Sequence, residues 1–299
     1  MASYGQWINA LPSPKGMLKD IQKSGRESLL KNGLPTRKME AWRLTNLKRL
    51  EKFLTLQPSV EGEKEANLRS QVWAKAPENA FRLVLKPNEI LQNLIDLPSG
   101  LRPLNNKEIK ACLDDSFKYI PHEEQWPLSV NCAANNEVFG LHVSGNTCPQ
   151  LELIIPAEEN VLIPSRVIIK IEEDAQLDLL QVVLGATHSA HSHILEIYMA
   201  KNSTLNHGFV AIGGGKASCL AQVSVVQESF SSYSLNSVQH GWSISRFEPK
   251  ILQKNGRSKT TLNGLQIAKG DEQLATHSSV RFEGPEGSLN QLQKATANG

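Results

Sequence analysis

The stretch VIIKIEEDAQLDLLQVVLGATHSAHSHILEIYMAKNSTLNHGFVAI, residues 167–212, decides the fold. It contains short runs rich in Val, Ile and Leu, which polar clusters such as Glu173–Gln176 and Lys201–Thr204 separate. Short apolar runs between turn residues, without a helical period, predict β-strands. Similar runs, beginning with Leu128–Cys132, continue to the end of the chain. We therefore expect an all-β architecture from residue 127 onward.

The turn clusters recur at a nearly constant distance. From Asp174 to Asn202, Glu228, Asn255 and Pro285 the gaps are 28, 26, 27 and 30 residues. Each gap holds two or three strand-like runs, as expected for successive coils of a solenoid. This coil length, without a hexapeptide repeat, favours a right-handed parallel β-helix, and a β-sandwich is the alternative that the pattern leaves open.

The N-terminal part of the chain has a different texture. Apolar residues near helical spacing predict helices up to about residue 56, and Gly33-Leu34-Pro35-Thr36 predicts a stop, with Thr36 capping the next helix. We divide the chain into residues 1–126, mainly helical with a few strands, and residues 127–299, an incomplete β-helix. Within the first part the sequence predicts a loop at Val60–Asn67, a strand at Phe81–Leu85 and a helix at Asn106–Ser116.

Composition excludes several classes of protein. Hydrophobic residues make up 40% of the chain, charged residues 21%, and the net charge is +2, so neither nucleic acid nor a membrane is the expected partner. No apolar run approaches the roughly 18 residues of a membrane helix. The cysteines are widely spaced, without a C-x-x-C pair, which favours a reducing compartment: they are Cys112, Cys132, Cys148 and Cys219. We expect a soluble, cytoplasmic protein.

Two stretches resemble the SufB/SufD family, and SufD-type members more than SufB. GLPTRKMEAWRLT, residues 33–45, is similar to an N-terminal signature, with Leu44 replacing an aromatic residue on a face expected to be buried. GRSKTTLNGL, residues 256–265, followed by Gly270–Gln273, His277 and SLNQLQK, residues 288–294, is similar to the family's distal β-helix. Ala275 and Gln293 depart from the family pattern, which usually has an acidic residue and a His there.

This resemblance implies a non-enzymatic component of the SUF scaffold, the SufB–SufC–SufD complex, that supports iron–sulfur cluster assembly and iron acquisition. The implied partners are a SufB-like β-helix protein and a SufC-like ABC ATPase. It implies no stably bound cofactor, only a transient cluster or iron within the complex. Family members continue beyond the position of Gly299 into a C-terminal helical domain that binds SufC. We therefore expect a truncated chain with impaired binding to the ATPase.

His188, His191 and His193 form the most suggestive local cluster. Imidazoles at this spacing can bind a borderline metal ion, and on a strand His191 and His193 would share one face. No cysteine or carboxylate lies within the cluster, so a solvated loop between Leu184 and Ile194 is the favoured interpretation.

Other candidates favour structural roles. Gly213–Lys216 lacks the Ser or Thr of a phosphate-binding loop and predicts a turn. Cys219 starts an apolar run, which favours a buried thiol over a ligand, and Cys112 and Cys132 have no stronger claim. Trp42 is expected in the core, with Glu40 and Arg43 exposed. A basic stripe would be solvated or dock an acidic partner: it comprises Arg37, Lys38, Arg43, Lys48, Arg49 and Lys52.

The sequence assigns no catalytic residue and no metal ligand, and His277 resembles a family position without its acidic neighbour. Two functions remain as alternatives to the scaffold: a β-helix carbohydrate-active enzyme and a purely structural β-solenoid. The low aromatic content of 6% disfavours the enzyme, since sugar sites use aromatic platforms. The N-terminal signature disfavours the structural solenoid.

Overall fold

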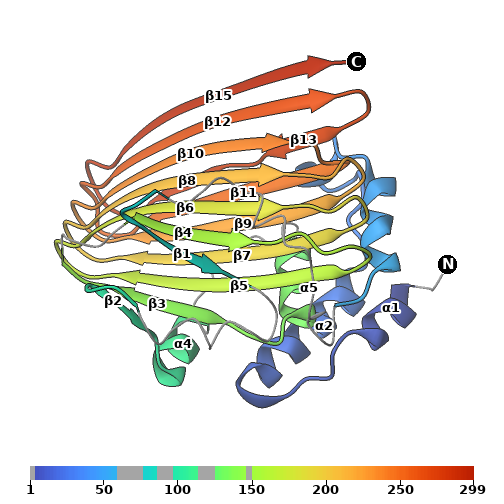
Figure 1. Cartoon of the computed structure of the whole chain (residues 1–299), viewed down its shortest axis with the longest axis horizontal. Coiled ribbons are helices and arrows are strands. Elements are labelled where there is room, and N and C mark those ends of the chain that lie inside the picture. Colours follow the sequence, from blue (N-terminus) through green and yellow to red (C-terminus); the bar gives the residue numbers. More distant parts are fainter. Residues whose placement is uncertain (1–3, 59–76, 86–96, 114–124, 146–149) are drawn as a thin grey trace.

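The computed structural model describes residues 4–58, 77–85, 97–113, 125–145 and 150–299. Strands from residue 139 onward coil about six times into a parallel β-solenoid, and the N-terminal helices lie along one side of it (Figure 1). The predicted parallel β-helix is therefore confirmed. None of the helices in these ranges has the length and hydrophobicity needed to cross a bilayer.

The helical elements gather in the N-terminal half of the chain. They are α1 (Tyr4–Ala10), η1 (Gly16–Leu18), α2 (Lys19–Asn32), η2 (Glu40–Trp42), η3 (Leu47–Thr55), α4 (Asn106–Leu113) and α5 (Trp126–Ala134). Helix α2 ends at Gly33, whose φ of 66° suits glycine, as predicted. The predicted cap at Thr36 is wrong, because the next helical turn is η2 and Met39 precedes it.

Fifteen strands form two sheets in the described residues. Sheet B has the order β1-β4-β6-β8-β10-β12-β15, and sheet A has the order β13-β11-β9-β7-β5-β3-β2, with β14 also beside β11. All pairs are parallel except β2 with β3. The strands are β1 (Ala80–Val84), β2 (Leu101–Pro103), β3 (Phe139–Val143), β4 (Gln150–Ile155), β5 (Leu162–Ile171), β6 (Gln176–Leu184), β7 (Ala190–Met199), β8 (Thr204–Ile212), β9 (Ser218–Gln227), β10 (Ser232–His240), β11 (Ile244–Gln253), β12 (Lys259–Lys269), β13 (Gln273–Thr276), β14 (Ser279–Phe282) and β15 (Ser288–Asn298).

The corners from sheet A to sheet B carry residues at positive φ: Asp174, Asn202 and Phe230 at three successive corners, and Gly256 with Arg257 at the next. Asp174 and Asn202 have φ values of 60° and 58°, in the left-handed region that Asn and Asp tolerate better than other non-glycine residues. A small buried residue follows at each of these two corners, Ala175 and Ser203, and the Ser203 hydroxyl donates to Ala200 O at 2.7 Å. This recurring turn explains the spacing seen in the sequence.

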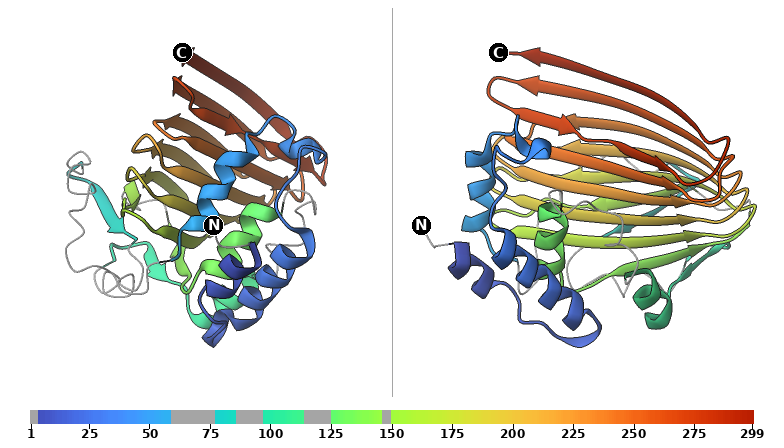
Figure 2. Two further views of the ribbon diagram at one scale, coloured as in Figure 1. Left: turned by 90° about the vertical axis from the view of Figure 1, so that its right-hand side faces the viewer. Right: turned by 180° about the vertical axis from the view of Figure 1, so that it is seen from behind.

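The two sheets differ on their outer faces. Strands β8 and β10 of sheet B alternate between buried and partly exposed residues, whereas nearly every residue of β7 and β11 in sheet A is buried. Helices cover part of sheet A, because α5 and η3 pack over the strand starts at Ala190, Leu220 and Ile244 (Figure 2). One face of sheet A is therefore buried in the solenoid core, and part of its other face is buried against these helices.

Helix α5 corrects one prediction. Leu128–Cys132 belongs to this helix and is not a strand, and Pro127 lies in its first turn, where the missing N–H costs nothing. All nine residues of the helix are buried, since it lies between α2 and sheet A. A helix that is buried on every side shows no polar face, and its sequence therefore lacks a helical period.

The predicted strand at Phe81–Leu85 and the predicted helix at Asn106–Ser116 are confirmed as β1 and α4, and Ser116 itself lies outside the described residues. The predicted loop at Val60–Asn67 also lies outside them. Leu44 is not buried: its side chain is 84% exposed. The Gln273 amide fixes the backbone there, donating to Leu44 O at 2.8 Å and accepting from Asn46 N at 2.7 Å.

Candidate functional site: a polar chain inside the solenoid

Polar side chains enter the solenoid interior, which apolar residues otherwise fill. On β7 the interior face carries Leu195 and Ile197, and the same alternation places His191 and His193 there as well. Both histidines are fully buried. The favoured prediction of a solvated loop is therefore wrong for these two, because β7 already begins at Ala190, and only His188 lies in an exposed turn.

His193 belongs to a continuous chain of hydrogen bonds. Its Nδ1 lies 2.6 Å from Ser165 Oγ, and its Nε2 contacts the Gln181 amide nitrogen. The Gln181 Oε1 lies 3.0 Å from His207 Nε2, and His207 Nδ1 lies 3.0 Å from the Tyr233 hydroxyl. One assignment satisfies every contact: Tyr233 donates to His207, His207 to Gln181, Gln181 to His193, and His193 to Ser165. In this assignment each of the two imidazoles carries one proton and is neutral.

Burial keeps these imidazoles neutral. Desolvation lowers the pKa of His193 and His207 to about 3, with a smaller contribution to His207 from the charge of His193. The same cause raises the pKa of the Tyr233 hydroxyl far above its usual value. At neutral pH the chain is therefore uncharged, and it crosses from β5 to β10 without an ionised group.

His191 lies beside this chain without joining it. The described residues offer no hydrogen-bond partner to either ring nitrogen of His191 or to the indole N–H of Trp242. The two rings pack edge to face, with centroids 5.5 Å apart. Desolvation, and secondarily His193, lower the pKa of His191 to about 3. An unsatisfied buried polar group costs about 1–3 kcal/mol, so His191 opposes folding.

Cys219 pairs in register with His191 on the adjacent strand β9. It is fully buried, and desolvation raises its pKa to about 12, although a hydrogen bond with Ser245 acts in the opposite direction. The Ser245 hydroxyl in turn donates to Gln239 Oε1 at 2.7 Å. Because a protonated thiol is a weak nucleophile and a weak ligand, Cys219 matches the predicted buried structural role.

A second buried polar group lies between sheet A and α5. The guanidinium of Arg166 lies 2.7 Å from the carboxylate of Glu196, and its Nη1 lies 3.3 Å from Cys132 Sγ. Desolvation dominates at Cys132 and raises its pKa to about 11. The ion pair is almost fully buried, so both charges depend on each other for compensation. Cys112 is likewise buried, in α4.

The remaining predicted residues do not join these groups. Gly213–Lys216 forms the turn between β8 and β9, as predicted. Trp42 is fully buried, and Glu40 and Arg43 form an exposed ion pair. His277 lies on the solenoid surface, 3.0 Å from Arg246 Nη1. Arg49 is not a solvated member of the basic stripe. Its guanidinium contacts Ser243 O and the Asp271 carboxylate, and its side chain is only 14% exposed.

The sequence reasoning missed Ser165, Gln181, His207 and Tyr233. Their signal is the coil length, since the contacts from Ser165 to His193, Gln181 to His207 and His207 to Tyr233 span 28, 26 and 26 residues. Residues one coil apart stack in a solenoid. Among the residues that the structure describes, no three His, Cys, Asp or Glu side chains are grouped to hold a metal ion.

Comparison with known proteins identifies the solenoid. Residues 153–299 match the family model of the SufBD core domain, described as SUF system FeS cluster assembly. The chain is 23% identical to the protein ABCI7, chloroplastic, of Arabidopsis thaliana over an alignment of 312 residues, which covers 96% of this chain and 64% of that protein. It is 24% identical over 144 residues to the iron-sulfur cluster assembly SufBD family protein slr0076 of Synechocystis, covering 45% of this chain and 32% of that protein.

The matched region runs from β4 to β15 and so includes every residue of the buried polar chain. The chain spans less than two thirds of the length of either relative. The N-terminal signature, the parallel solenoid and the core-domain match agree with one another, and residues 153–299 of the chain are similar to the core domain of the SufB/SufD family of the SUF iron–sulfur cluster assembly system.

Proposed function

We propose that this chain is the body of a SufD-type subunit, a non-catalytic part of a SufB–SufC–SufD scaffold that supports cluster assembly and iron acquisition. The observation that carries this proposal is the SufBD core match along the parallel solenoid. The partners that we propose are a SufB-like β-helix protein and a SufC-like ABC ATPase. No cofactor is bound permanently in this account: iron or a cluster would be held only transiently, within the assembled complex.

The chemistry of the buried groups supports a non-catalytic role. General acid–base catalysis near neutral pH requires a group with a pKa close to 7. Burial instead moves the pKa of His193 to about 3 and that of Cys219 to about 12, and both side chains lie inside the core. The polar chain then serves to fix the register of neighbouring coils through hydrogen bonds.

The compartment that we propose is the cytoplasm, a reducing environment. The cysteines in the described residues, Cys112, Cys132 and Cys219, are all free and buried, which agrees with reducing conditions. One relative carries the description chloroplastic, and that description concerns ABCI7 itself.

Depletion of the protein in its own cells tests this function. The activity of a [4Fe–4S] enzyme such as aconitase should fall, and the activity of a cluster-free enzyme such as malate dehydrogenase should not. Reconstitution of aconitase with iron and sulfide in the extract should restore its activity, because only the cluster is missing. Unchanged aconitase activity in depleted cells, with the depletion verified, would contradict the proposal.

A further inference from the structure

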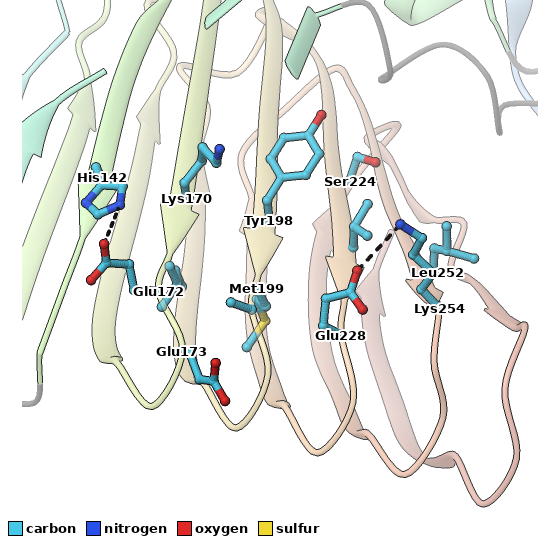
Figure 3. A pocket seen from close by; sticks show the side chains of 13 residues that line it. His142, Lys170, Glu172, Glu173, Tyr198, Met199, Ser224, Glu228, Leu252 and Lys254 are labelled. Atoms are coloured by element: carbon cyan, nitrogen blue, oxygen red, sulfur yellow. Dashed lines mark ion pairs between the residues drawn. The ribbon is translucent and has the colours of Figure 1, made fainter. Parts of the chain in front are cut away.

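A groove lies on the outer face of sheet A, and α4 borders it at Tyr198, whose hydroxyl donates to Cys112 O at 3.0 Å. Its volume is about 400 Å³, and it crosses β3, β5, β7, β9 and β11 (Figure 3). Helices α5 and η3 pack over the first residues of the sheet A strands, whereas the groove lies over their C-terminal halves, beside the contact of α4 with Ile168 and Tyr198. It is thus separate from the polar chain inside the solenoid.

The groove is long, because it runs from strand to strand along the solenoid axis. Five neighbouring strands are separated by four spacings of about 4.8 Å, which gives a length of about 19 Å. An extended peptide rises about 3.3 Å per residue, so about six residues would fill this length. A groove of this shape on a half-covered sheet suits an extended segment better than a compact small molecule, which requires enclosure.

The middle of the groove combines apolar and hydrogen-bonding groups. Tyr198, Val226 and Leu252 occupy one register row across β7, β9 and β11, and Lys170 extends this row onto β5. Ser224 lies one step away on the same face of β9. Figure 3 shows the side chains of Lys170, Tyr198 and Ser224 between the His142–Glu172 contact at one end of the groove and the Glu228–Lys254 ion pair at the other.

Among the described residues that line the groove, Lys170 is a cation without an ion pair, although its charge interacts with that of Glu108 on α4. Glu172 accepts from His142 Nε2 at 3.0 Å, where burial lowers the pKa of His142, so this pair is a hydrogen bond from a neutral imidazole. Glu228 lies 3.5 Å from Lys254 Nζ, and Glu173 lies 3.6 Å from Lys201 Nζ. For Lys170, by contrast, the described part of the chain provides no ion pair or hydrogen bond to the ammonium group.

From this arrangement we propose that the groove binds an extended, mainly apolar peptide segment of a partner protein, with one acidic side chain that pairs with Lys170. The apolar side chains of the segment lie on Tyr198, Val226 and Leu252, and the Ser224 hydroxyl bonds the segment's backbone. The site does not depend on the SUF role, so each can fail without the other.

A displayed library of random heptapeptides, selected against the intact chain, tests the site directly. The selected peptides should share an Asp or Glu flanked by aliphatic or aromatic residues. Fluorescence anisotropy then measures the Kd of one synthetic consensus peptide and of its copy with Lys in place of the acidic residue. For the acidic peptide, Lys170→Glu should raise the Kd at least about tenfold, the usual scale for loss of a charge-assisted contact. The Lys-bearing copy should bind Lys170→Glu better than the unaltered chain.

Two further variants complete the test. Ser224→Trp fills the floor of the groove and should abolish binding of both peptides. Lys216→Glu makes the same charge change in the exposed turn between β8 and β9, outside the groove, and should leave both Kd values unchanged. Circular dichroism verifies the folding of each variant. No shared motif among the selected peptides, or equal affinity of the acidic peptide for Lys170→Glu and Lys216→Glu, would overturn the proposal.

Discussion

The guanidinium of Arg246 lies 4.0 Å above the centre of the Trp42 ring and donates to the neighbouring Ala41 O at 2.7 Å. Trp42 comes from the N-terminal signature and Arg246 from β11, so residues about two hundred positions apart lock the signature onto the solenoid. The same guanidinium contacts the buried carboxylate of Glu248 at 2.5 Å. The N-terminal signature therefore holds the helical part of the chain against the solenoid.

These contacts of Arg246 predict a large effect of Arg246→Ala on stability. The substitution removes the stacking on Trp42 and leaves the buried Glu248 with Lys250, at 3.6 Å, as its ion-pair partner among the described residues, so the free energy of unfolding should fall by about 3 kcal/mol. The matched control is Arg257→Ala, whose ion pair with Glu286 is more than half exposed and should cost less than about 1 kcal/mol. Urea unfolding measures both values, and equal losses would contradict the prediction.

His191 and His193 should respond oppositely to replacement by phenylalanine. His191→Phe removes two unsatisfied nitrogens and keeps an aromatic ring against Trp242, so stability at neutral pH should stay level or rise. His193→Phe breaks the contacts with Ser165 and Gln181 and should cost about 2–3 kcal/mol. Urea unfolding at pH 7.5 distinguishes them, and a His191→Phe that is as unstable as His193→Phe would show that the interior arrangement is wrong.

The buried histidines also predict acid sensitivity. Their pKa in the folded chain is about 3, below the ordinary value of 6.5, so the unfolded chain binds more protons between these values. Proton binding by the unfolded chain therefore does not reduce stability above about pH 6.5, and it reduces stability progressively as the pH falls toward 3. The urea midpoint should therefore fall less between pH 7 and pH 4.5 in His191→Phe than in the unaltered chain. His188→Phe, at an exposed position, serves as the control and should follow the unaltered chain.

Phe230 occupies an unfavourable corner. Its φ is 62°, in the region where Asp174 and Asn202 lie at equivalent corners, and its side chain is 48% exposed. A bulky residue in the left-handed region costs about 1–2 kcal/mol, which Asn largely avoids. Phe230→Asn should therefore raise the melting temperature, and the reverse change Asn202→Phe should lower it. If Phe230→Asn melts below the unaltered chain, the stacking of Arg257 on Phe230 outweighs the backbone strain.

The coil architecture could be predicted from the sequence because it depends on local signals. Turn residues such as Asp174 and Asn202 recur at the coil length, and the backbone angles there favour residues of this type. Helix α5 could not be recognised, since burial on all sides removes the polar face that marks a helix. The interior positions of His191 and His193 depend on where β7 begins, and the flanking serines concealed that boundary.

Contacts between residues that are far apart in the sequence could not be predicted from local sequence patterns either. Gln181 and His207 are separated by one coil and become neighbours only when β6 and β8 pair in register. Leu44 follows the buried Trp42 by two residues, yet it points outward because the Gln273 amide holds its backbone in a turn on β13. Such contacts follow from the stacking of distant coils.

Association with a SufB-like protein tests the proposed role in the SUF system most directly. The complete protein and the SufB-like protein of the same genome should be co-expressed, with a tag on one of them, and their complex measured by size-exclusion chromatography with light scattering. The account predicts a heteromeric complex of defined mass that survives high salt, because paired β-helices would associate through backbone and apolar contacts. Two separate peaks from folded proteins, each with the mass of its own chain, would contradict it.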